Sequence, residues 1–128
     1  MIFKQIDEVL SGRKTQTRRL VKAGDFQTPS GNIVYGESGK TTLIPRFVVG
    51  KRYAVQPGRA KRGVGHIRIT EIRLEYVYQI TEDDAIAEGV NSVEEYRQLW
   101  DSIYEGQPAK QWDATPMVWV ITFEVVRG

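Results

Sequence analysis

The sequence of 128 residues contains no cysteine and only one histidine, and these two absences exclude several chemistries. Without cysteine the chain has no disulfide, no thiolate metal site and no cysteine nucleophile. His66 lies in the alternating run GHIRIT, which is typical of a strand, and one imidazole without clustered carboxylates makes a poor metal site. We therefore expect neither a metal nor another cofactor.

Long apolar runs are also lacking, and none approaches the length of a membrane span. The N-terminal run MIFKQIDEVL carries Lys4, Asp7 and Glu8 inside its apolar pattern, which is unlike a signal peptide. The length suits one ordinary domain, so we expect a single domain over residues 1–128. We expect a soluble, cytoplasmic protein with no membrane partner, and a monomer.

Positive and negative charges are unevenly distributed along the chain, although the net charge is only +2. Residues 13–73 contain fourteen Lys and Arg against three acids, whereas residues 74–105 contain nine acids against one Arg. The pattern fits two oppositely charged faces that partly neutralise each other. It also fits a basic surface for a polyanion such as RNA, and both interpretations stay open.

The apolar pattern predicts an α+β fold without internal repeats. Residues 3–10 have apolar side chains at helical spacing. Residues 23–50 are rich in glycine and proline, which is typical of an irregular excursion with a hairpin. The runs at 51–55 and 65–77 are typical of strands, and a slip of the apolar phase in the second predicts a bulge near Glu71.

Two helices and a final strand complete the expected fold. Thr81 is a good N-cap with Asp84 three residues on, Gly89 ends that helix, and Ser92 begins the next with a capping box. The run PMVWVITFEVV alternates two apolar faces, which suits a strand that closes a barrel or is buried on both sides. These elements together predict a small, partly open β-barrel with short helices at its ends.

One motif suggests a phosphate-binding P-loop, because Gly39, Lys40 and Thr41 match its G-K-[ST] tail. The first glycine of that pattern would fall at position 34, where the chain has Val34, and Pro45 would break the helix that must follow. We therefore expect a turn with a solvated lysine and no binding of a nucleoside triphosphate.

The segment GRKTQTRR, residues 12–19, places two threonines among four cations and contains no carboxylate. Glu88 lies in the last turn of its predicted helix, just before Gly89, where the helix dipole disfavours a negative charge. A solvated glutamate would lose little there, but a cation facing it would remove the cost. Glu88 is therefore a candidate to face the cations of residues 13–19.

Four segments carry a resemblance to a known family. LSGRKTQTRRLVK, ITEDDAIAEGV, YRQLWDSIYEG and WDATPMVWVITFE resemble segments that occur in the same order in ASCH-domain proteins of the PUA-like superfamily, especially small ones encoded by phages and prophages. The resemblance covers the start of the chain and nearly everything after Gly65. It implies a β-barrel with helices at its ends and a cleft at its mouth, lined by GRKTQTRR.

For some small bacterial ASCH proteins the implied activity is hydrolysis of the amide of 4-acetylcytidine to cytidine and acetate. By motif position, the resemblance implies that Lys14, Thr17 and Glu88 are catalytic. The chain departs from the phage pattern in residues 51–65, which are more basic and richer in glycine, and in residues 23–50, which are longer than in the short hydrolases.

The chemistry of these three residues leaves two assignments open. A threonine hydroxyl needs a base before it can attack an amide carbonyl. Lys14 could be that base if the neighbouring arginines and partial burial lower its pKa. Alternatively, Glu88 is the base and a charged Lys14 stabilises the oxyanion. Because Lys14 and Thr17 would point to opposite faces of a regular strand, both assignments predict a bulge or loop at Gln16.

The remaining cations suggest how a substrate is held, since loops with arginine and lysine contact phosphates. A tyrosine could stack on a base, although a core position is the commoner role. The candidates for binding a substrate or RNA are Arg13, Arg18, Arg19, Arg52, Tyr53, Arg59, Lys61 and Arg62.

Two function classes follow from these residues. The first is a metal-independent amidohydrolase that acts on an acylated nucleoside or nucleotide through Lys14, Thr17 and Glu88. The second is a noncatalytic RNA-binding module of the PUA-like type that uses the same basic cleft. We favour the enzyme, with a modified nucleoside or RNA as its partner.

Overall fold

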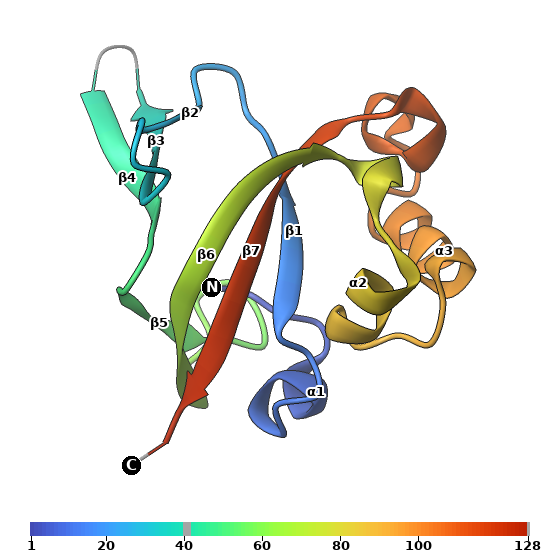
Figure 1. The fold of residues 1–128 in the computed structure, drawn as a ribbon, viewed down its shortest axis with the longest axis horizontal. Helices are drawn as coiled ribbons and strands as arrows, with labels where there is room; N and C mark the ends of the chain where they lie inside the picture. Colours follow the sequence, from blue (N-terminus) through green and yellow to red (C-terminus); the bar gives the residue numbers. More distant parts are fainter. Residues whose placement is uncertain (40–41, 128) are drawn as a thin grey trace.

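The computed structural model describes residues 1–39 and 42–127, which form a mixed α and β fold with two antiparallel sheets and a few short helices (Figure 1). Three single turns of 3₁₀ helix lie at Val77–Gln79, Pro108–Lys110 and Trp112–Ala114. The helices are α1 (Ile6–Leu10), α2 (Glu82–Ala87) and α3 (Val93–Ile103). The strands are β1 (Gln16–Leu20), β2 (Phe26–Gln27), β3 (Ile33–Ser38), β4 (Thr42–Val48), β5 (Arg52–Val55), β6 (Gly65–Tyr76) and β7 (Met117–Val126).

The larger sheet has the strand order β1-β7-β6-β5, so β7 lies inside the sheet and β1 forms one edge. The two-sided apolar pattern of β7 agrees with this position, because both of its faces are covered. In β6 the register shifts between Ile69 and Glu71, which leaves Thr70 as the extra residue of a bulge. The bulge predicted near Glu71 is therefore confirmed, and it bends the strand.

The smaller sheet, β2-β3-β4, is formed by the segment that was expected to be irregular. Its predicted hairpin is present as β3 and β4, but β2 adds a third strand, so residues 26–48 are more regular than the sequence indicated. Buried Val34 and Phe47 pack from this sheet against Ile69 of β6. Lys40 and Thr41, on which the expected P-loop-like turn rests, lie outside the described residues.

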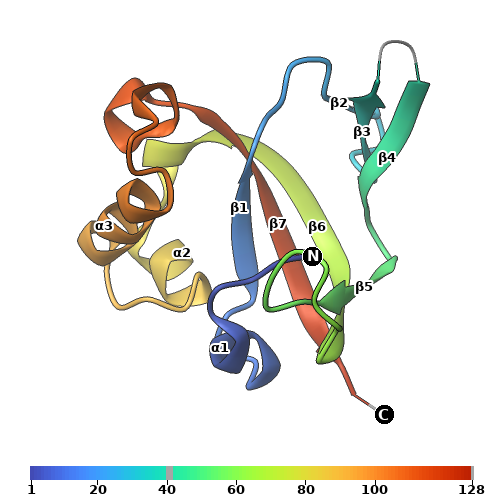
Figure 2. The same cartoon turned by 180° about the vertical axis from the view of Figure 1, so that it is seen from behind.

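The two sheets face each other without joining into one closed barrel among the described residues. The main sheet lies in the middle of the molecule, with the smaller sheet on one side and α2 and α3 on the other (Figures 1 and 2). The expected barrel is therefore not confirmed, and the described residues form two antiparallel sheets instead. The outer edge of β1 pairs with no other strand among the described residues, and the site described below lies along this edge.

The helices α2 and α3 begin at the predicted caps. The Thr81 hydroxyl accepts a hydrogen bond from the Asp84 amide at 3.1 Å, and the Asp84 carboxylate accepts one in return from the Thr81 amide. The Ser92 hydroxyl accepts a bond from the Glu95 amide at 3.1 Å. Buried residues of these helices pack with Val118 and Val120 of β7, which fixes both helices against one face of the main sheet.

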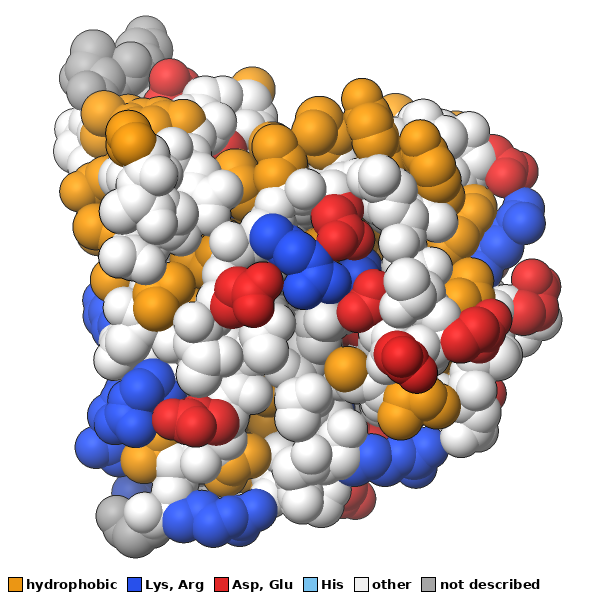
Figure 3. Space-filling view, viewed as in Figure 1, with side chains coloured by type: hydrophobic (Ala, Val, Ile, Leu, Met, Phe, Trp, Pro, Cys, Tyr) orange, Lys and Arg blue, Asp and Glu red, His pale blue; other side chains and the backbone are white. Residues whose placement is uncertain are grey.

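Parts of the basic and acidic halves of the sequence meet in the folded molecule. Arg73 of β6 forms ion pairs with Glu71, Glu75 and Asp84 at 3.7, 2.7 and 3.3 Å. Figure 3 shows positive side chains at the centre of this face with negative side chains around them. Much of the charge asymmetry of the sequence is therefore neutralised locally on this face.

No helix in the described part of the chain is both long enough and apolar enough to cross a membrane.

Candidate active site

The segment before β1 places Lys14 between two helices. After α1, Gly12 adopts a φ of 83°, which allows the chain to turn back sharply. The Lys14 amide then donates to the Glu8 carbonyl of α1 at 2.8 Å, and the Thr15 amide donates to the Ala87 carbonyl of α2 at 2.7 Å. The regular strand begins at Gln16, so the break that separates Lys14 from Thr17 lies at Lys14–Thr15 and not at Gln16, where it was expected.

Lys14 and Arg18 both bind the carboxylate of Glu88. The Lys14 ammonium lies 2.8 Å from Glu88 Oε1 and donates a second bond to the Glu88 carbonyl at 3.1 Å. The Arg18 guanidinium lies 2.8 Å from Glu88 Oε2. Glu88 is the C-cap of α2, so two cations offset its unfavourable place at the negative end of the helix. The expected contact between Glu88 and the cations of residues 13–19 is present.

These three charges are removed from solvent, since Lys14, Arg18 and Glu88 are exposed by only 5, 4 and 1%. Burial is the main cause that lowers the pKa of Lys14 from its ordinary value of 10.5, and the nearby cations Arg19 and Arg18 lower it further. The carboxylate of Glu88 acts in the opposite direction without cancelling the effect of burial. Lys14 is therefore more readily deprotonated than a surface lysine.

Arg18 is more deeply enclosed than an arginine that only binds substrate. Its guanidinium also lies 3.5 Å from Glu75 and 3.4 Å from Asp84, and it donates to the side chain of Gln16. Among the described residues, the Nε of Arg18 is the single buried side-chain nitrogen or oxygen without a hydrogen-bond partner. Arg18 lines the pocket and binds Glu88, and its expected contact with substrate stays a prediction.

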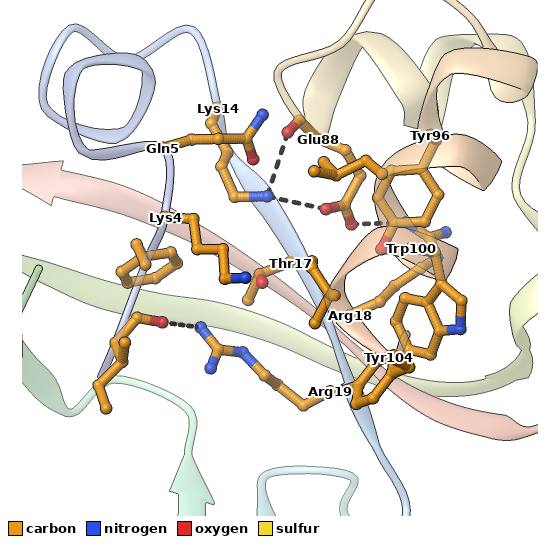
Figure 4. Close-up of a pocket in the computed structure, with 14 residues that line it drawn as sticks. Lys4, Gln5, Lys14, Thr17, Arg18, Arg19, Glu88, Tyr96, Trp100 and Tyr104 are labelled. Atoms are coloured by element: carbon orange, nitrogen blue, oxygen red, sulfur yellow. Dashed lines mark hydrogen bonds and ion pairs between the residues drawn. The ribbon is translucent and has the colours of Figure 1, made fainter. Parts of the chain in front are cut away.

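Thr17 lies at a pocket of about 200 Å³ that also contains the Lys14–Glu88 pair (Figure 4). Its hydroxyl has no hydrogen-bond partner among the described residues and is not sealed from the pocket, so it is available to a ligand. The pocket lies where β1 has its open edge, between the N-terminal segment and α3. It is lined by Ile2, Phe3, Lys4, Gln5, Lys14, Thr17, Arg18, Arg19, Glu88, Tyr96, Leu99, Trp100, Ile103 and Tyr104.

The backbone of β1 also offers hydrogen-bonding groups to this opening. The Thr15 carbonyl accepts from the Phe123 amide, and the Val21 amide donates to the Met117 carbonyl. Backbone pairing alternates along an antiparallel strand. The backbone N–H and C=O groups of the odd-numbered residues of β1 therefore bond to β7, and those of the even-numbered residues point away from β7. The N–H and C=O of Arg18 therefore point to the open edge.

The aromatic wall of the pocket was not predicted from the sequence. Tyr96, Trp100 and Tyr104 are spaced four residues apart, which puts them on one side of α3, and the rings of Trp100 and Tyr104 have centroids 4.8 Å apart. This spacing is the signal that could have identified the wall. Phe3 was expected in the first helix, but that helix begins at Ile6, and Phe3 lies in an extended segment that bonds to Gln56.

Only one of the other candidate binding residues lies at the pocket. Arg19 lines the pocket, whereas Arg13 is exposed and donates to Asn91 at 3.1 Å. Tyr53 packs with two core clusters, and its hydroxyl accepts a bond from the Val48 amide at 3.0 Å. Arg52, Arg59, Lys61 and Arg62 are exposed on β5 and the loop that follows it, outside the pocket.

Across residues 1–39 and 42–127, no group of three or more carboxylate or imidazole side chains is placed to bind a metal ion.

Comparisons with known proteins identify the fold. The chain matches no protein-family model, and no curated protein matches it at a significant level. An ASCH domain from Lactobacillus crispatus has a similar structure, with a TM-score of 0.64 and 19% identity over 93% of this chain and 68% of that one. A protein of Enterococcus faecalis from the DUF984 family has a TM-score of 0.59 and 21% identity over 94 and 68% of the two chains.

These similarities show that the chain has an ASCH-like fold. At such low identities they show the fold alone.

Proposed function

We propose that this protein hydrolyses the amide bond of an acylated nucleoside such as 4-acetylcytidine. The observation that carries the proposal is the buried Lys14–Glu88 pair, at 2.8 Å, beside an unpaired Thr17 hydroxyl in one pocket. A nucleophile, a candidate base and a group that orients the base are the parts that covalent amide hydrolysis needs. The resemblance described from the sequence implies the same three residues as catalytic.

Of the two possible bases, the geometry favours Lys14. Both carboxylate oxygens of Glu88 already accept hydrogen bonds, one from Lys14 and one from Arg18, so Glu88 is poorly placed to take a proton from Thr17. Burial lowers the pKa of Lys14, which increases the fraction of neutral amine that can act as a base. Glu88 then serves to orient the Lys14 amine.

The reaction balances with water as the only co-reactant. The neutral Lys14 amine takes the Thr17 proton, and the Thr17 oxygen bonds to the acyl carbon. When the carbon–nitrogen bond breaks, the Lys14 ammonium returns the proton to the leaving exocyclic nitrogen, which releases cytidine and leaves an acyl ester on Thr17. Lys14 then takes a proton from water, hydroxide attacks the ester, and acetic acid departs while the Thr17 hydroxyl is restored.

The surroundings supply two further functions. The amide of Arg18, which points to the open edge of β1, follows the nucleophile directly and can donate to the developing oxyanion. Phe3, Tyr96, Trp100 and Tyr104 give the pocket flat apolar surfaces, which suit a nucleobase because every base presents a π face.

The direct test is incubation of purified protein with 4-acetylcytidine, followed by chromatography of the nucleosides and assay of acetate. We expect equal amounts of cytidine and acetate, at a rate that an added chelator leaves unchanged. Hydrolysis that stops when chelator is added would contradict the metal-independent mechanism. Absence of hydrolysis with 4-acetylcytidine and with other N4-acylated cytidines would overturn the proposal.

One observation favours the second candidate, a noncatalytic RNA-binding module. The exposed cations Arg52, Arg59, Lys61 and Arg62 lie on the segment whose Gln56 bonds to the backbone of Met1 and Phe3. The N-terminal segment, which forms one wall of the pocket, therefore lies next to the segment that carries these cations. An RNA chain could follow that surface through its phosphates. RNA binding without any hydrolysis would select this candidate.

A further inference from the structure

Two of the four cations that line the pocket lack an acidic partner. Lys14 and Arg18 are each bonded to Glu88, and Arg18 also meets Glu75 and Asp84. Lys4 and Arg19 line the same pocket, but within the described residues neither forms a salt bridge. Glu88 is the only acidic residue of the lining, so the pocket carries a net positive charge.

Arg19 is held in place without being neutralised. Its guanidinium donates to the Ile2 carbonyl at 2.7 Å and lies 5.1 Å from the centre of the Phe3 ring. That bond uses one of the five N–H donors of the group, which leaves donors for a ligand. Burial is the main cause that lowers the pKa of Arg19, so the cation is partly desolvated. A desolvated cation with free donors is well suited to bind an anion.

The position of Arg19 relative to Thr17 indicates which part of a substrate it would meet. The two residues are two positions apart on β1, so their side chains leave the same face of the strand about 6.7 Å apart. Figure 4 shows the Lys14–Glu88 pair at one end of the labelled residues, Arg19 at the other end and Thr17 between them. An acetyl group extends only one methyl beyond its carbonyl, so the Arg19 end is left for the nucleoside.

We infer that the pocket is built for a phosphate ester of the acylated nucleoside, with the phosphate bound by Arg19 and Lys4 while the acyl carbon lies at Thr17. This inference rests on the proposed function, since it names the substrate class of the same site. The phosphate could belong to a free nucleotide or to an RNA chain. Arg19 would give it directed hydrogen bonds, and the exposed Lys4 would add a mobile charge.

The test compares kcat/KM for three substrates: 4-acetylcytidine, its 5′-monophosphate, and a short oligoribonucleotide with one internal 4-acetylcytidine. We expect the monophosphate to exceed the nucleoside by about tenfold or more, which is the range of one charge-assisted hydrogen bond. Arg19→Gln should remove most of this preference. The preference is measured as the ratio of the two kcat/KM values, because Arg19 also lowers the pKa of Lys14 and its loss can change the rate with the nucleoside. A higher value for the oligoribonucleotide than for the monophosphate would identify RNA as the source of the phosphate.

Two further variants keep the test interpretable if Arg19→Gln folds poorly. Lys4 is exposed, so Lys4→Gln should fold normally and should reduce the preference for the monophosphate by a smaller factor. The matched control is Lys22→Gln, which removes an exposed cation outside the pocket and should leave the preference unchanged. Equal kcat/KM for all three substrates in the wild type would overturn the phosphate subsite while leaving the hydrolase intact.

Binding separates this inference from the proposed function. Trp100 lines the pocket, so its fluorescence can report the binding of cytidine and of cytidine 5′-monophosphate without turnover. Tighter binding of the monophosphate, lost in Arg19→Gln, together with no hydrolysis of any substrate, would overturn the hydrolase and support the subsite. Equal binding of both compounds and no hydrolysis would overturn both.

Discussion

The Lys14 ammonium and the Glu88 carboxylate, 74 residues apart in the sequence, meet at 2.8 Å inside the protein. Neither charge would be stable there alone, because moving one ion out of water costs several kcal/mol even after the protein relaxes. Arg18 completes the group by binding the second oxygen of Glu88 at 2.8 Å. Lys14 and Thr17 line the same pocket, and burial lowers the pKa of Lys14.

Replacing Thr17 by valine tests the nucleophile. Valine keeps the β-branched shape and removes only the hydroxyl, so the fold and the thermal midpoint should change little. We expect kcat for 4-acetylcytidine to fall by about a thousandfold or more, because no attacking group remains. The matched control is Thr15→Val, which lies outside the pocket lining and should retain near wild-type turnover. Equal losses in both variants would show that the hydroxyl of Thr17 has no special role.

The pH dependence of kcat/KM tests which residue is the base. A lysine that serves as a base must be neutral, and burial lowers the pKa of Lys14 below 10.5. Activity should therefore rise with pH through a limb whose midpoint lies below 10.5. Activity that does not change with pH across the alkaline range would contradict Lys14 as the base.

The same lowered pKa has a consequence for stability. Between the folded and unfolded pKa values of Lys14, the unfolded state binds more protons than the folded state, so the unfolding free energy should rise with pH in that window. Replacing Lys14 by methionine should flatten this rise. The measurement is urea unfolding at a series of alkaline pH values, and an unchanged slope in the variant would show that another group titrates there.

Removing the charge of Glu88 should destabilise the protein strongly. Glu88→Gln leaves Lys14 and Arg18 buried without their shared anion, and breaking a buried pair costs about 3–5 kcal/mol. Combining Glu88→Gln with Lys14→Met should recover part of the loss, because it removes one unpaired cation. The control is Asp113→Asn, which breaks an exposed pair with Arg97 and should cost less than about 1 kcal/mol in urea unfolding.

Replacing Gly89 by alanine tests how closely the chain at the end of α2 approaches Lys14. The Gly89 φ of 89° is unfavourable for other residues, and a Cβ there would lie 3.3 Å from the Cβ of Lys14. Gly106 has a similar φ of 77° but open space around the same point. Both alanine variants should lose about 1–2 kcal/mol from the backbone alone. Gly89→Ala should lose more in urea unfolding and should also lower kcat, and equal losses in stability would contradict the close approach.

Substitutions in the basic loop after β5 test whether its cations bind RNA. Replacing Arg59, Lys61 and Arg62 together by glutamine should weaken RNA binding and reduce the log-log salt slope by about one for each lost phosphate contact. The comparison variant replaces Lys22 and Lys110, exposed cations beside a different hollow. An unchanged slope in the triple variant would assign the loop cations to solubility.

Local features of this fold could be predicted from the sequence, because they depend on neighbouring residues. The cap at Thr81, the end of α2 before Gly89 and the bulge next to Glu71 each follow from a few side chains and their spacing. The smaller sheet was predicted less well, because glycine and proline are frequent in residues 23–50 and its strands are stabilised by packing on β6.

The candidate site shows the same division. The sequence by itself made Lys14, Thr17 and Glu88 candidates through the resemblance, and it indicated that a cation facing Glu88 would offset its place at the helix end. Only the tertiary structure decided that Lys14 and Arg18 share Glu88. It also decided that Lys4 and Arg19 line the pocket without forming a salt bridge to a described residue. Which charges are paired depends on burial and on distances between elements that are remote in the sequence. Neither can be read from the spacing of neighbouring residues.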